Sequence, residues 1–370
     1  MSALFSPLTL RGLTLANRIV VSPMCQYMAE HGKATAWHLM HLGNLALSGA
    51  GAVFIEATAV EPPGRITHGC LGLWDDATEA ALVPVFDALR RYAPGTPLVM
   101  QIAHAGRKAS SRAPWEGGQM IPIADGGWLP DAPSALPHKD GETIPRAIDA
   151  DGLRRIRDAF AATAQRAVRL GAAGIEVHAA HGYLLHQFLS PIANQRSDEY
   201  GGSLENRMRF PLEVFDAVRA AVPADRPVGV RVSATDWVAG GWDLEQTMVL
   251  ARELKRRGVD WIAASSGGIS PRQKIPLAPG YQVPFAQALR EAGVTAIAVG
   301  LITEAKQAEA IVAEGQADAV ALARAMLYDP RWPWHAAAEL GASVEAPPAY
   351  WRAPPQGKGG VFRNTTFGAR

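Results

Sequence analysis

Two histidines and a tyrosine stand within six consecutive residues, His178 to Tyr183, with the sequence HAAHGY. The segment directly follows a mostly apolar run, 174–177, that is typical of a buried parallel strand. Reaction sites of α/β proteins lie just past the carboxyl ends of such strands. Imidazole N–H groups can hydrogen-bond to a carbonyl oxygen, and a phenol can donate a proton. These residues are suited to making a carbonyl compound accept electrons, and a cofactor must supply the electrons.

The histidine pair also allows two other interpretations. Two histidines three residues apart can bind zinc, although a catalytic zinc site normally needs a third protein ligand and no His-Glu-x-x-His motif is present. Either His178 or His181 alone could be a hydrogen-bonded residue at a strand end. Tyr183 beside both of them weakens that interpretation. Tyr27 would face the same end of the fold, and a core role and a functional role are equally supported for it.

Polar side chains inside two other expected strands suggest a bound heterocycle. The Gln101 amide needs partners for its donor and its acceptor, and the pyrimidine edge of a flavin or neighbouring backbone would serve equally well. Arg231 among strand residues is costly unless a negative group compensates it. Reduced flavin carries such charge, and a buried Asp or Glu is the alternative.

Residues 22–25, Ser-Pro-Met-Cys, directly follow the first strand. Proline fixes the backbone there, and the peptide groups around it are free to meet a flat polar heterocycle. Cys25 could adjust the electron affinity of such a ring, but a small buried cysteine is the commoner case and is favoured when the residue is taken alone. A nucleophilic Cys25 would need a base at hand, which the sequence does not show.

The ends of the last strands favour a phosphate site. Loops after strands seven and eight of a barrel often hold a phosphate with backbone N–H groups, and Arg324 is placed to supply the charge. A surface arginine that caps a helix is the alternative. Gly267 and Gly268, after the sixth strand, would give the same ligand close backbone approach.

Short β-rich runs alternate with amphipathic helical stretches along most of the chain, which favours parallel strands with crossover helices. Helical spacing over 153–170 follows Asp149 and Asp151, and helical spacing over 244–257 follows Asp243. Eight repeats and the absence of Gly-x-Gly-x-x-Gly after any strand predict an α/β fold of the (β/α)8 TIM barrel type. The eight expected strands are 19–22, 53–57, 98–103, 174–178, 228–233, 261–265, 296–299 and 319–323.

Three segments depart from this rhythm. Residues 105–148, rich in Gly, Pro, Trp and Asp, predict a capping segment after the third strand. Residues 8–15 alternate around Gly12 and predict an N-terminal β-hairpin that plugs the opposite end of the barrel. The tail from Ala346 onward is dense in Pro, Gly and Arg.

The composition predicts one large globular domain. The chain has 370 residues, 48% of them apolar, and a net charge of +1 that gives no reason to expect nucleic acid or a membrane surface as partner. Two cysteines predict no disulfide framework and suit a reducing compartment. The first residues lack signal-peptide features and no apolar run is long enough to cross a bilayer, so we expect a soluble, cytoplasmic protein.

Five segments of the chain carry a family resemblance: NRIVVSPMCQY (17–27), QIAHAGRK (101–108), EVHAAHGYL (176–184), SDEYGGSLENR (197–207) and VRVS (230–233). They resemble the old yellow enzymes, the FMN-dependent ene-reductases, and most closely the bacterial thermophilic-like branch with an active-site cysteine. The likeness runs from about the first residues to Arg352, and several long motifs in the same order make it specific.

The resemblance implies a tightly but non-covalently bound FMN at the barrel mouth, with NADPH or NADH as the hydride-donating cosubstrate. The positions that match the family's flavin contacts are Ser22, Pro23, Met24, Cys25, Ala57, Gln101, Arg231, Gly300, Ala323 and Arg324.

The same resemblance implies roles for the residues that meet the substrate, an activated alkene. His178 and His181 match the pair that hydrogen-bonds the substrate carbonyl, and Tyr27 matches a second contact. Hydride is expected to pass from the flavin N5 to the β-carbon of an α,β-unsaturated carbonyl compound. Tyr183, taken as a phenol of ordinary pKa, then protonates the α-carbon. Arg231 balances the charge of reduced FMN, and Cys25 tunes its potential.

The tail carries one further expectation from the family. Arg352 matches an arginine that this branch inserts into the site of a neighbouring subunit, which implies a homodimer or homotetramer. We therefore expect a single domain over residues 1–352 and a flexible extension over 353–370. Ala323 stands where relatives commonly have Gly, but its backbone N–H is kept, so FMN binding is expected to survive.

Other functions fit the sequence less well. Amine-dehydrogenase relatives usually carry a cysteine cluster that binds iron–sulfur and an extra nucleotide domain. Two cysteines are too few for such a cluster, and 370 residues are too few for a barrel with that domain. A metal-dependent barrel hydrolase and a flavin-binding sensor without turnover are further rivals. A flavin barrel that mainly reduces nitro-compounds or other xenobiotics is the alternative within the same family.

Overall fold

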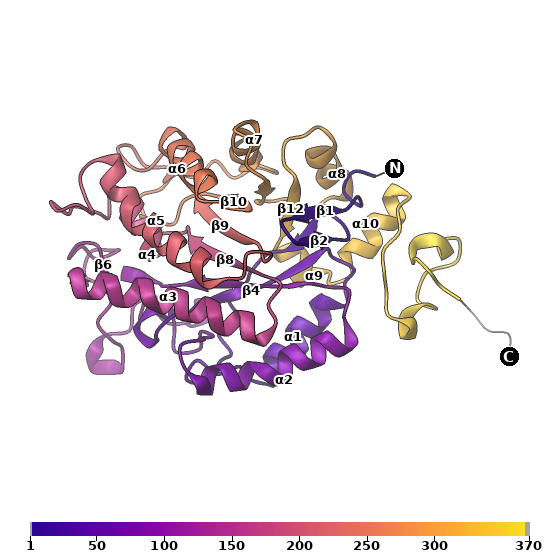
Figure 1. Ribbon diagram of the computed structural model, residues 1–370, viewed down its shortest axis with the longest axis horizontal. Helices are drawn as coiled ribbons and strands as arrows, with labels where there is room; N and C mark the ends of the chain where they lie inside the picture. The colour runs from indigo at the N-terminus through magenta and orange to yellow at the C-terminus, as the bar shows by residue number, and fades with distance from the viewer. Residues whose placement is uncertain (1, 367–370) are drawn as a thin grey trace.

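A closed barrel of eight parallel strands forms the centre of the computed structural model, which describes residues 2–366 (Figure 1). Each strand pairs with its neighbours along the chain, and β12 closes the barrel against β3. All eight expected strands are present within two residues of their predicted bounds, so the predicted (β/α)8 barrel is confirmed. The barrel strands are β3 (Ile19–Val21), β4 (Ala52–Ala59), β5 (Leu98–Ala103), β8 (Gly174–Ala179), β9 (Val228–Ser233), β10 (Trp261–Ser265), β11 (Ala296–Ala298) and β12 (Ala319–Leu322).

Helices surround the barrel, and side-chain caps start the two that the sequence predicted. Asp149 accepts a hydrogen bond from the N–H of Gly152 at 2.8 Å, and Asp243 accepts one from Gln246 at 2.9 Å. No helix within residues 2–366 has both the length and the apolar composition needed to cross a membrane. The helices are α1 (Ala36–Ala46), α2 (Asp76–Tyr92), α3 (Ala150–Leu170), α4 (Leu184–Leu189), α5 (Leu204–Ala221), α6 (Leu244–Arg256), α7 (Val283–Glu291), α8 (Ala305–Ala313), α9 (Arg324–Tyr328) and α10 (Trp332–Leu340).

The register of the barrel brings the polar strand residues to two adjacent levels. Gln101 on β5 pairs with Glu176 on β8, and His178, two residues further on, pairs with Arg231 on β9. Side chains of successive parallel strands in register lie side by side. The polar residues that the sequence scattered over three strands therefore gather at the carboxyl end of the barrel.

The hairpin closes the amino end. Strands β1 (Leu8–Leu10) and β2 (Leu13–Leu15) pair antiparallel, with Leu8 opposite Leu15. Leu10 and Leu15 are buried in one apolar cluster with Phe54 and Trp261 of the barrel interior. The predicted plug is confirmed.

The segment over residues 105–148 leaves the barrel after β5 and contains the 3-10 turns η2 (Gly106–Lys108), η3 (Pro114–Glu116) and η4 (Ile123–Asp125). It also holds a parallel pair of short strands, β6 (Asp131–Ala132) and β7 (Arg146–Ala147). Trp115 in η3 packs edge-on against the ring of Tyr27, with 5.7 Å between the ring centroids. The segment thus reaches the loop after the first barrel strand.

The tail returns to the barrel after Arg352. Val361 and Phe362 are buried, and the Phe362 ring packs against Trp334 of α10 with 4.8 Å between centroids. The expectation of a flexible extension is therefore corrected at residues 361 and 362, where both side chains are buried and Phe362 packs on α10, and it stays a prediction for the other residues of 353–366. The remainder of that expectation, residues 367–370, lies outside the described residues.

Candidate active site

His178, His181 and Tyr183 form one cluster at the carboxyl end of β8. The ring centroids of His178 and His181 are 5.0 Å apart, and those of His178 and Tyr183 are 5.1 Å apart. All three pairs of rings meet edge-to-face. The three residues that the sequence singled out are therefore brought to one place.

Both imidazoles are neutral. Burial lowers the pKa of His178 and of His181 well below the usual value, and the charge of Arg231 lowers both further. The N–H of Ala180 donates to Nδ1 of His178 at 3.2 Å, so the proton of the neutral ring is on Nε2. Nε2 of His181 lies 2.7 Å from the hydroxyl of Ser265. If that hydroxyl donates, Nδ1 of His181 carries the proton, and each ring offers one N–H.

The phenol of Tyr183 is held in its protonated form. Burial raises its pKa above that of a free phenol, so the expectation of an ordinary pKa is wrong in magnitude, while the protonation state is the expected one. The Nζ of Lys108 lies 5.2 Å from the centre of the Tyr183 ring. A proton donor and a cation therefore share this end of the barrel.

Lys108 is a residue whose position the sequence did not signal. Its Nζ donates to the carbonyl oxygens of His181 at 2.9 Å and of Gly268 at 3.2 Å. Burial, with the nearby charges of Arg107 and Lys139, lowers the pKa of Lys108 to about 8. The contact could not be found from sequence, because residue 108 is 73 positions from residue 181.

Arg231 is buried with part of its hydrogen-bonding capacity unused. Nη1 donates to the hydroxyl of Ser22 at 3.0 Å, but Nε has no partner among residues 2–366. Glu176 lies near enough for its charge to raise the pKa of Arg231, although burial lowers that pKa more strongly. No ion pair within 4.0 Å joins Arg231 to an acid in the described chain, so a ligand with acceptor atoms or negative charge would complete its environment.

A cavity of about 220 Å³ adjoins Arg231 and runs to the ends of β11 and β12. It brings together five residues that the sequence assigned to one ligand: Ser22, Arg231, Gly300, Ala323 and Arg324. Gln101 lies on β5, two strands away from Arg231 on β9, and donates from Nε2 to Glu176 of the intervening strand β8 at 2.7 Å. Its first partner is thus a carboxylate, and the second amide proton is left for another acceptor.

Gly267 and Gly268 do not serve this cavity as expected. The N–H of Gly267 donates to the Thr235 carbonyl at 2.8 Å, and the N–H of Gly268 donates to the side chain of Gln273 at 2.6 Å. Neither glycine is among the residues that line the cavity, so the expectation of a close approach to the phosphate is corrected. These N–H groups are used within the chain, and Gly268 instead packs against the backbone of His181.

Cys25 and Tyr27 follow β3. Burial raises the pKa of the Cys25 thiol, and the charge of Glu56 adds to this, so the sulfur is protonated and poorly suited to act as a nucleophile. Burial likewise raises the pKa of Tyr27, and Cys25 and Tyr183 are the next causes. Electrostatic coupling of Tyr27 with Tyr183 indicates that the two phenols lie on the same side of the barrel.

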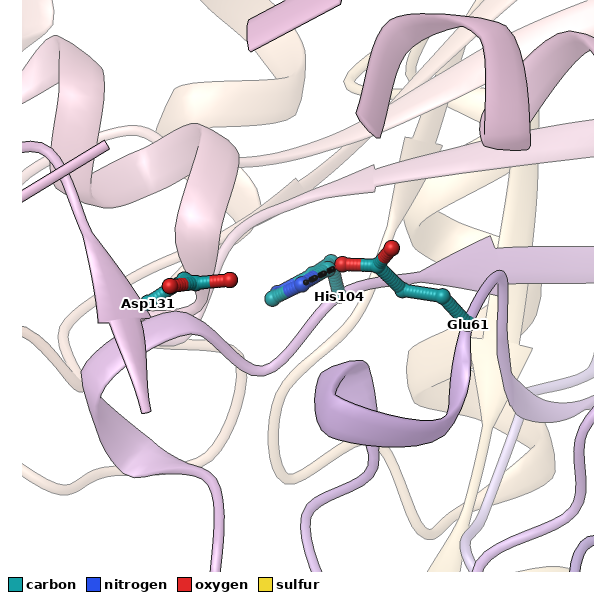
Figure 2. A group of neighbouring side chains, drawn as sticks. All are labelled: Glu61, His104 and Asp131. Atoms are coloured by element: carbon teal, nitrogen blue, oxygen red, sulfur yellow. Dashed lines mark hydrogen bonds and ion pairs between the residues drawn. The ribbon is translucent and has the colours of Figure 1, made fainter. Parts of the chain in front are cut away.

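Glu61, His104 and Asp131 form a second cluster of potential ligating groups, shown in Figure 2. Nδ1 of His104 accepts the N–H of Gly106 at 3.0 Å, and Nε2 lies 2.9 Å from Glu61. Arg155 contacts Glu61 and also donates to Asp131 at 3.1 Å. A guanidinium therefore already balances the two carboxylates at this cluster.

Arg352 is exposed in the tail, after the 3-10 turn η5 (Pro348–Tyr350). In Figure 1 the tail lies at one end of the long axis and β6 of the capping segment near the other. Within one chain, the structure does not bring Arg352 to the histidine pair.

A family model described as the NADH:flavin oxidoreductase / NADH oxidase family matches residues 3–342. The chain belongs to this family. It is 43% identical over 354 residues to an NADPH dehydrogenase of Geobacillus thermodenitrificans, which covers 95% of this chain and 98% of the relative. Morphinone reductase in complex with tetrahydroNAD is 31% identical with a TM-score of 0.76, covering 93% of this chain and 92% of that one. A 2-naphthoyl-CoA reductase is 25% identical with a TM-score of 0.82, and the chain spans 52% of its length.

Membership makes the protein an old yellow enzyme-type oxidoreductase that uses FMN, with NAD(P)H as hydride donor. The residues present fit that cofactor. The unused Nε of buried Arg231 and the 220 Å³ cavity beside Arg324 offer a donor and a positive charge, as a flavin ring and a phosphate require. The metal alternative for the histidine pair has no support from position, since the group with metal-ligand spacing in the described chain is at Glu61, His104 and Asp131.

Proposed function

We propose that this old yellow enzyme-family protein reduces the C=C bond of α,β-unsaturated carbonyl compounds. One observation carries the proposal: two neutral imidazoles and a protonated phenol lie with ring centroids 5.0 and 5.1 Å apart beside the cavity that suits FMN. Bound FMN supplies the hydride that it has accepted from NAD(P)H. The remaining work falls to the residues of this chain.

His178 and His181 bind the carbonyl oxygen of the substrate. Because both rings are neutral, each can donate one N–H to that oxygen, His181 through Nδ1 when the Ser265 hydroxyl donates to its Nε2. Negative charge develops on the oxygen as the β-carbon accepts hydride, and the hydrogen bonds from the two imidazoles to this oxygen then become stronger. The buried position of His178 limits competition from water.

Tyr183 donates the proton to the α-carbon. Its raised pKa keeps the phenol protonated at neutral pH, so it can act as the proton donor. An enolate is basic enough at its α-carbon to accept this proton once the carbonyl is held by the histidines. Tyr27 contributes a second contact to the substrate from the opposite loop.

The FMN contacts follow from the cavity and the strand ends. Arg231 compensates negative charge on the flavin, and Arg324 compensates the phosphate. Cys25 presents its thiol near the ring and adjusts its potential. The remaining contacts are assigned to Ser22, Pro23, Met24, Ala57, Gln101, Gly300 and Ala323.

A second copy of the chain completes the site. Arg352 is exposed, and its own chain does not bring it to the histidine pair, as expected for a residue delivered to a neighbouring subunit. The protein is then a homodimer or homotetramer, and residues 1–352 form one functional domain covered by the segment 105–148. Deletion from Tyr350 onward should change substrate kinetics, and unchanged kinetics with an intact oligomer would remove Arg352 from the site.

The test of the reaction uses the two half-reactions of the holoenzyme. Anaerobic NADPH should bleach the flavin absorbance, and 2-cyclohexenone should restore it in proportion to the cyclohexanone formed. Bleaching without reoxidation by any enone contradicts the proposal. Reoxidation by nitro-compounds alone would favour the nitro-reductase alternative.

A further inference from the structure

The turn that carries His181 and Tyr183 has an unusual backbone. His181 has φ of 60° and Gly182 has φ of 73°, both in the left-handed region, which is costly for a residue with a side chain. The turn is also pressed against the loop after β10, since a Cβ on Gly182 would lie 2.0 Å from the carbonyl oxygen of Gly268. Such a backbone persists only when its surroundings fix it. The groups behind the turn therefore decide where His181 and Tyr183 point.

His186 holds the turn through one hydrogen bond. The N–H of Gly182 donates to Nδ1 of His186 at 2.9 Å, and the imidazole is fully buried in α4. Because Nδ1 accepts, the proton of the ring is on Nε2. Nε2 is 2.8 Å from Oδ1 of Asp236, and neither atom has a hydrogen-bond partner elsewhere in residues 2–366. The contact is close although the N–H is not well aligned with the oxygen.

Asp236 is itself fixed from the other side. Its Oδ2 accepts from the hydroxyl of Ser190 at 2.6 Å and from the N–H of Trp242 at 2.7 Å. Burial raises the pKa of Asp236, but His186, Ser190 and Trp242 together outweigh it and leave the pKa below the usual value. A fully buried carboxylate is rare unless it has such partners. The proposed mechanism gives this ion no task.

We propose that Asp236 and His186 are positioning residues of the His181–Tyr183 turn. Asp236 fixes the tautomer of His186, and His186 holds the N–H of Gly182, so that the imidazole of His181 and the phenol of Tyr183 face one ligand. Neither residue touches that ligand. The inference rests on the proposed function, because that function gives the turn its importance.

The tautomer makes a sharp test possible. In Asp236→Asn, the oxygen that accepts from Ser190 and Trp242 must stay an oxygen, so the amide NH₂ takes the place of Oδ1. His186 would then have to accept at Nε2 and move its proton to Nδ1, where it meets the N–H of Gly182. Alkene reduction should fall on the order of 10²-fold, as for a displaced reacting group.

The rescue variant is His186→Asn in the Asp236→Asn background. The side-chain oxygen of the amide introduced by His186→Asn can replace Nδ1 as acceptor for Gly182 and has no tautomer to lose. We expect the double variant to recover at least about tenfold in alkene reduction over Asp236→Asn, a coupling that independent destabilisation does not produce. His186→Gln in the same Asp236→Asn background, whose amide reaches toward residue 236 and leaves the N–H of Gly182 without an acceptor, should remain slow. Equal rates in Asp236→Asn and the double variant overturn the proposal.

Thr247→Val is the matched control. It removes a buried hydroxyl of α6 that accepts from the indole N–H of Trp242 at 2.6 Å and donates to the carbonyl of Ala234 at 2.9 Å, both in the loop that carries Asp236. We expect it to lower Tm about as much as Asp236→Asn while both half-reactions keep their rates. An Asp236→Asn holoenzyme that is no slower than Thr247→Val overturns the proposal.

A crystal structure of the Asp236→Asn holoenzyme separates this inference from the proposed function. A turn that keeps positive φ at His181 and Gly182 with unmoved side chains contradicts the inference, whichever substrate the enzyme reduces. A displaced turn in an enzyme whose wild type reduces no enone supports the positioning role and contradicts only the ene-reductase assignment.

Discussion

The two ends of the barrel are made by the same eight strands and are filled in opposite ways. At the amino end, Leu10 and Leu15 of the hairpin pack with Phe54 and Trp261, and the interior is apolar. At the carboxyl end the interior holds Arg231 with an unused donor. The amino end is completed by apolar side chains of the same chain, whereas the donor at the carboxyl end requires a ligand.

This difference shows that the amino end of the barrel contributes mainly to stability and the carboxyl end mainly to function. Apolar burial at the plug contributes roughly 25 cal/mol per Å² without any partner. Buried charges at the mouth cost free energy until a ligand compensates them. Changes at the mouth should therefore affect chemistry more than stability, and changes at the plug should do the reverse.

Tyr183→Phe should have the largest effect on chemistry. Loss of the proton donor should slow alkene reduction by about 10²–10⁴-fold, the usual contribution of general acid catalysis. Flavin reduction by NADPH should change little, because no proton is donated in that step by Tyr183. Stopped-flow absorbance measures both rates, and equal slowing of the two would refute the assignment.

Arg231→Met should weaken FMN binding. A hydrogen bond to a charged group contributes about 1.5–3 kcal/mol, so the Kd of FMN should rise roughly 10- to 150-fold. Fluorescence of released flavin measures this. Arg219→Met, at the opposite end of the barrel, is the control, because Arg219 binds the backbone at residues 222 and 223 there and should leave FMN affinity unchanged. If Arg231→Met does not fold, Arg231→Lys keeps the charge and should still lose several-fold.

Lys108→Met should remove the pH dependence with which the wild type binds an anionic ligand. The pKa of Lys108 is lowered to about 8 by burial, so the ammonium is present below that pH and is lost above it. A ligand that carries negative charge on oxygen should bind the wild type more weakly as pH rises through 8. Native Lys108 holds fewer protons than the unfolded chain between pH 8 and the usual lysine pKa, so stability should rise with pH over that range.

The ligand for this test is a phenol ionised across the whole pH range, titrated by the change in flavin absorbance. Lys108→Met should show a flat profile near pH 8 and about tenfold weaker binding below it, as expected for loss of one partly buried charge interaction. A wild-type profile without a step near pH 8 contradicts this role.

The sequence predicted the barrel because its signals are local. Apolar strand runs, Asp149 and Asp243 as helix starts, and the alternation around Gly12 each depend on neighbouring residues. His178 could be assigned to the mouth for the same reason, since it ends a strand.

Long-range contacts could not be predicted in this way. The partly buried ammonium of Lys108 reaches the turn from another segment, as does Asp236 through His186. No sequence motif around Lys108 or Asp236 indicates that these residues lie close to the turn. Gly268 was misassigned to the phosphate because a glycine pair signals close approach without identifying the partner, which is the backbone of His181. Phe362 was missed because its partner, Trp334, lies in an earlier helix.

Leu15→Ala should have the smallest effect on chemistry and completes the comparison. The side chain is 1% exposed and buried against the barrel interior, so truncation should destabilise the fold by about 2–5 kcal/mol through lost transfer free energy and a cavity. Urea unfolding measures this loss. Both half-reactions at 25 °C should keep wild-type rates, because the plug is at the far end of the barrel from His178 and Tyr183. A holoenzyme that unfolds at a lower urea concentration yet turns over at the wild-type rate establishes that the two ends act independently. Slowed hydride transfer in a fully folded Leu15→Ala protein would instead mean that packing at the amino end sets the geometry of the mouth.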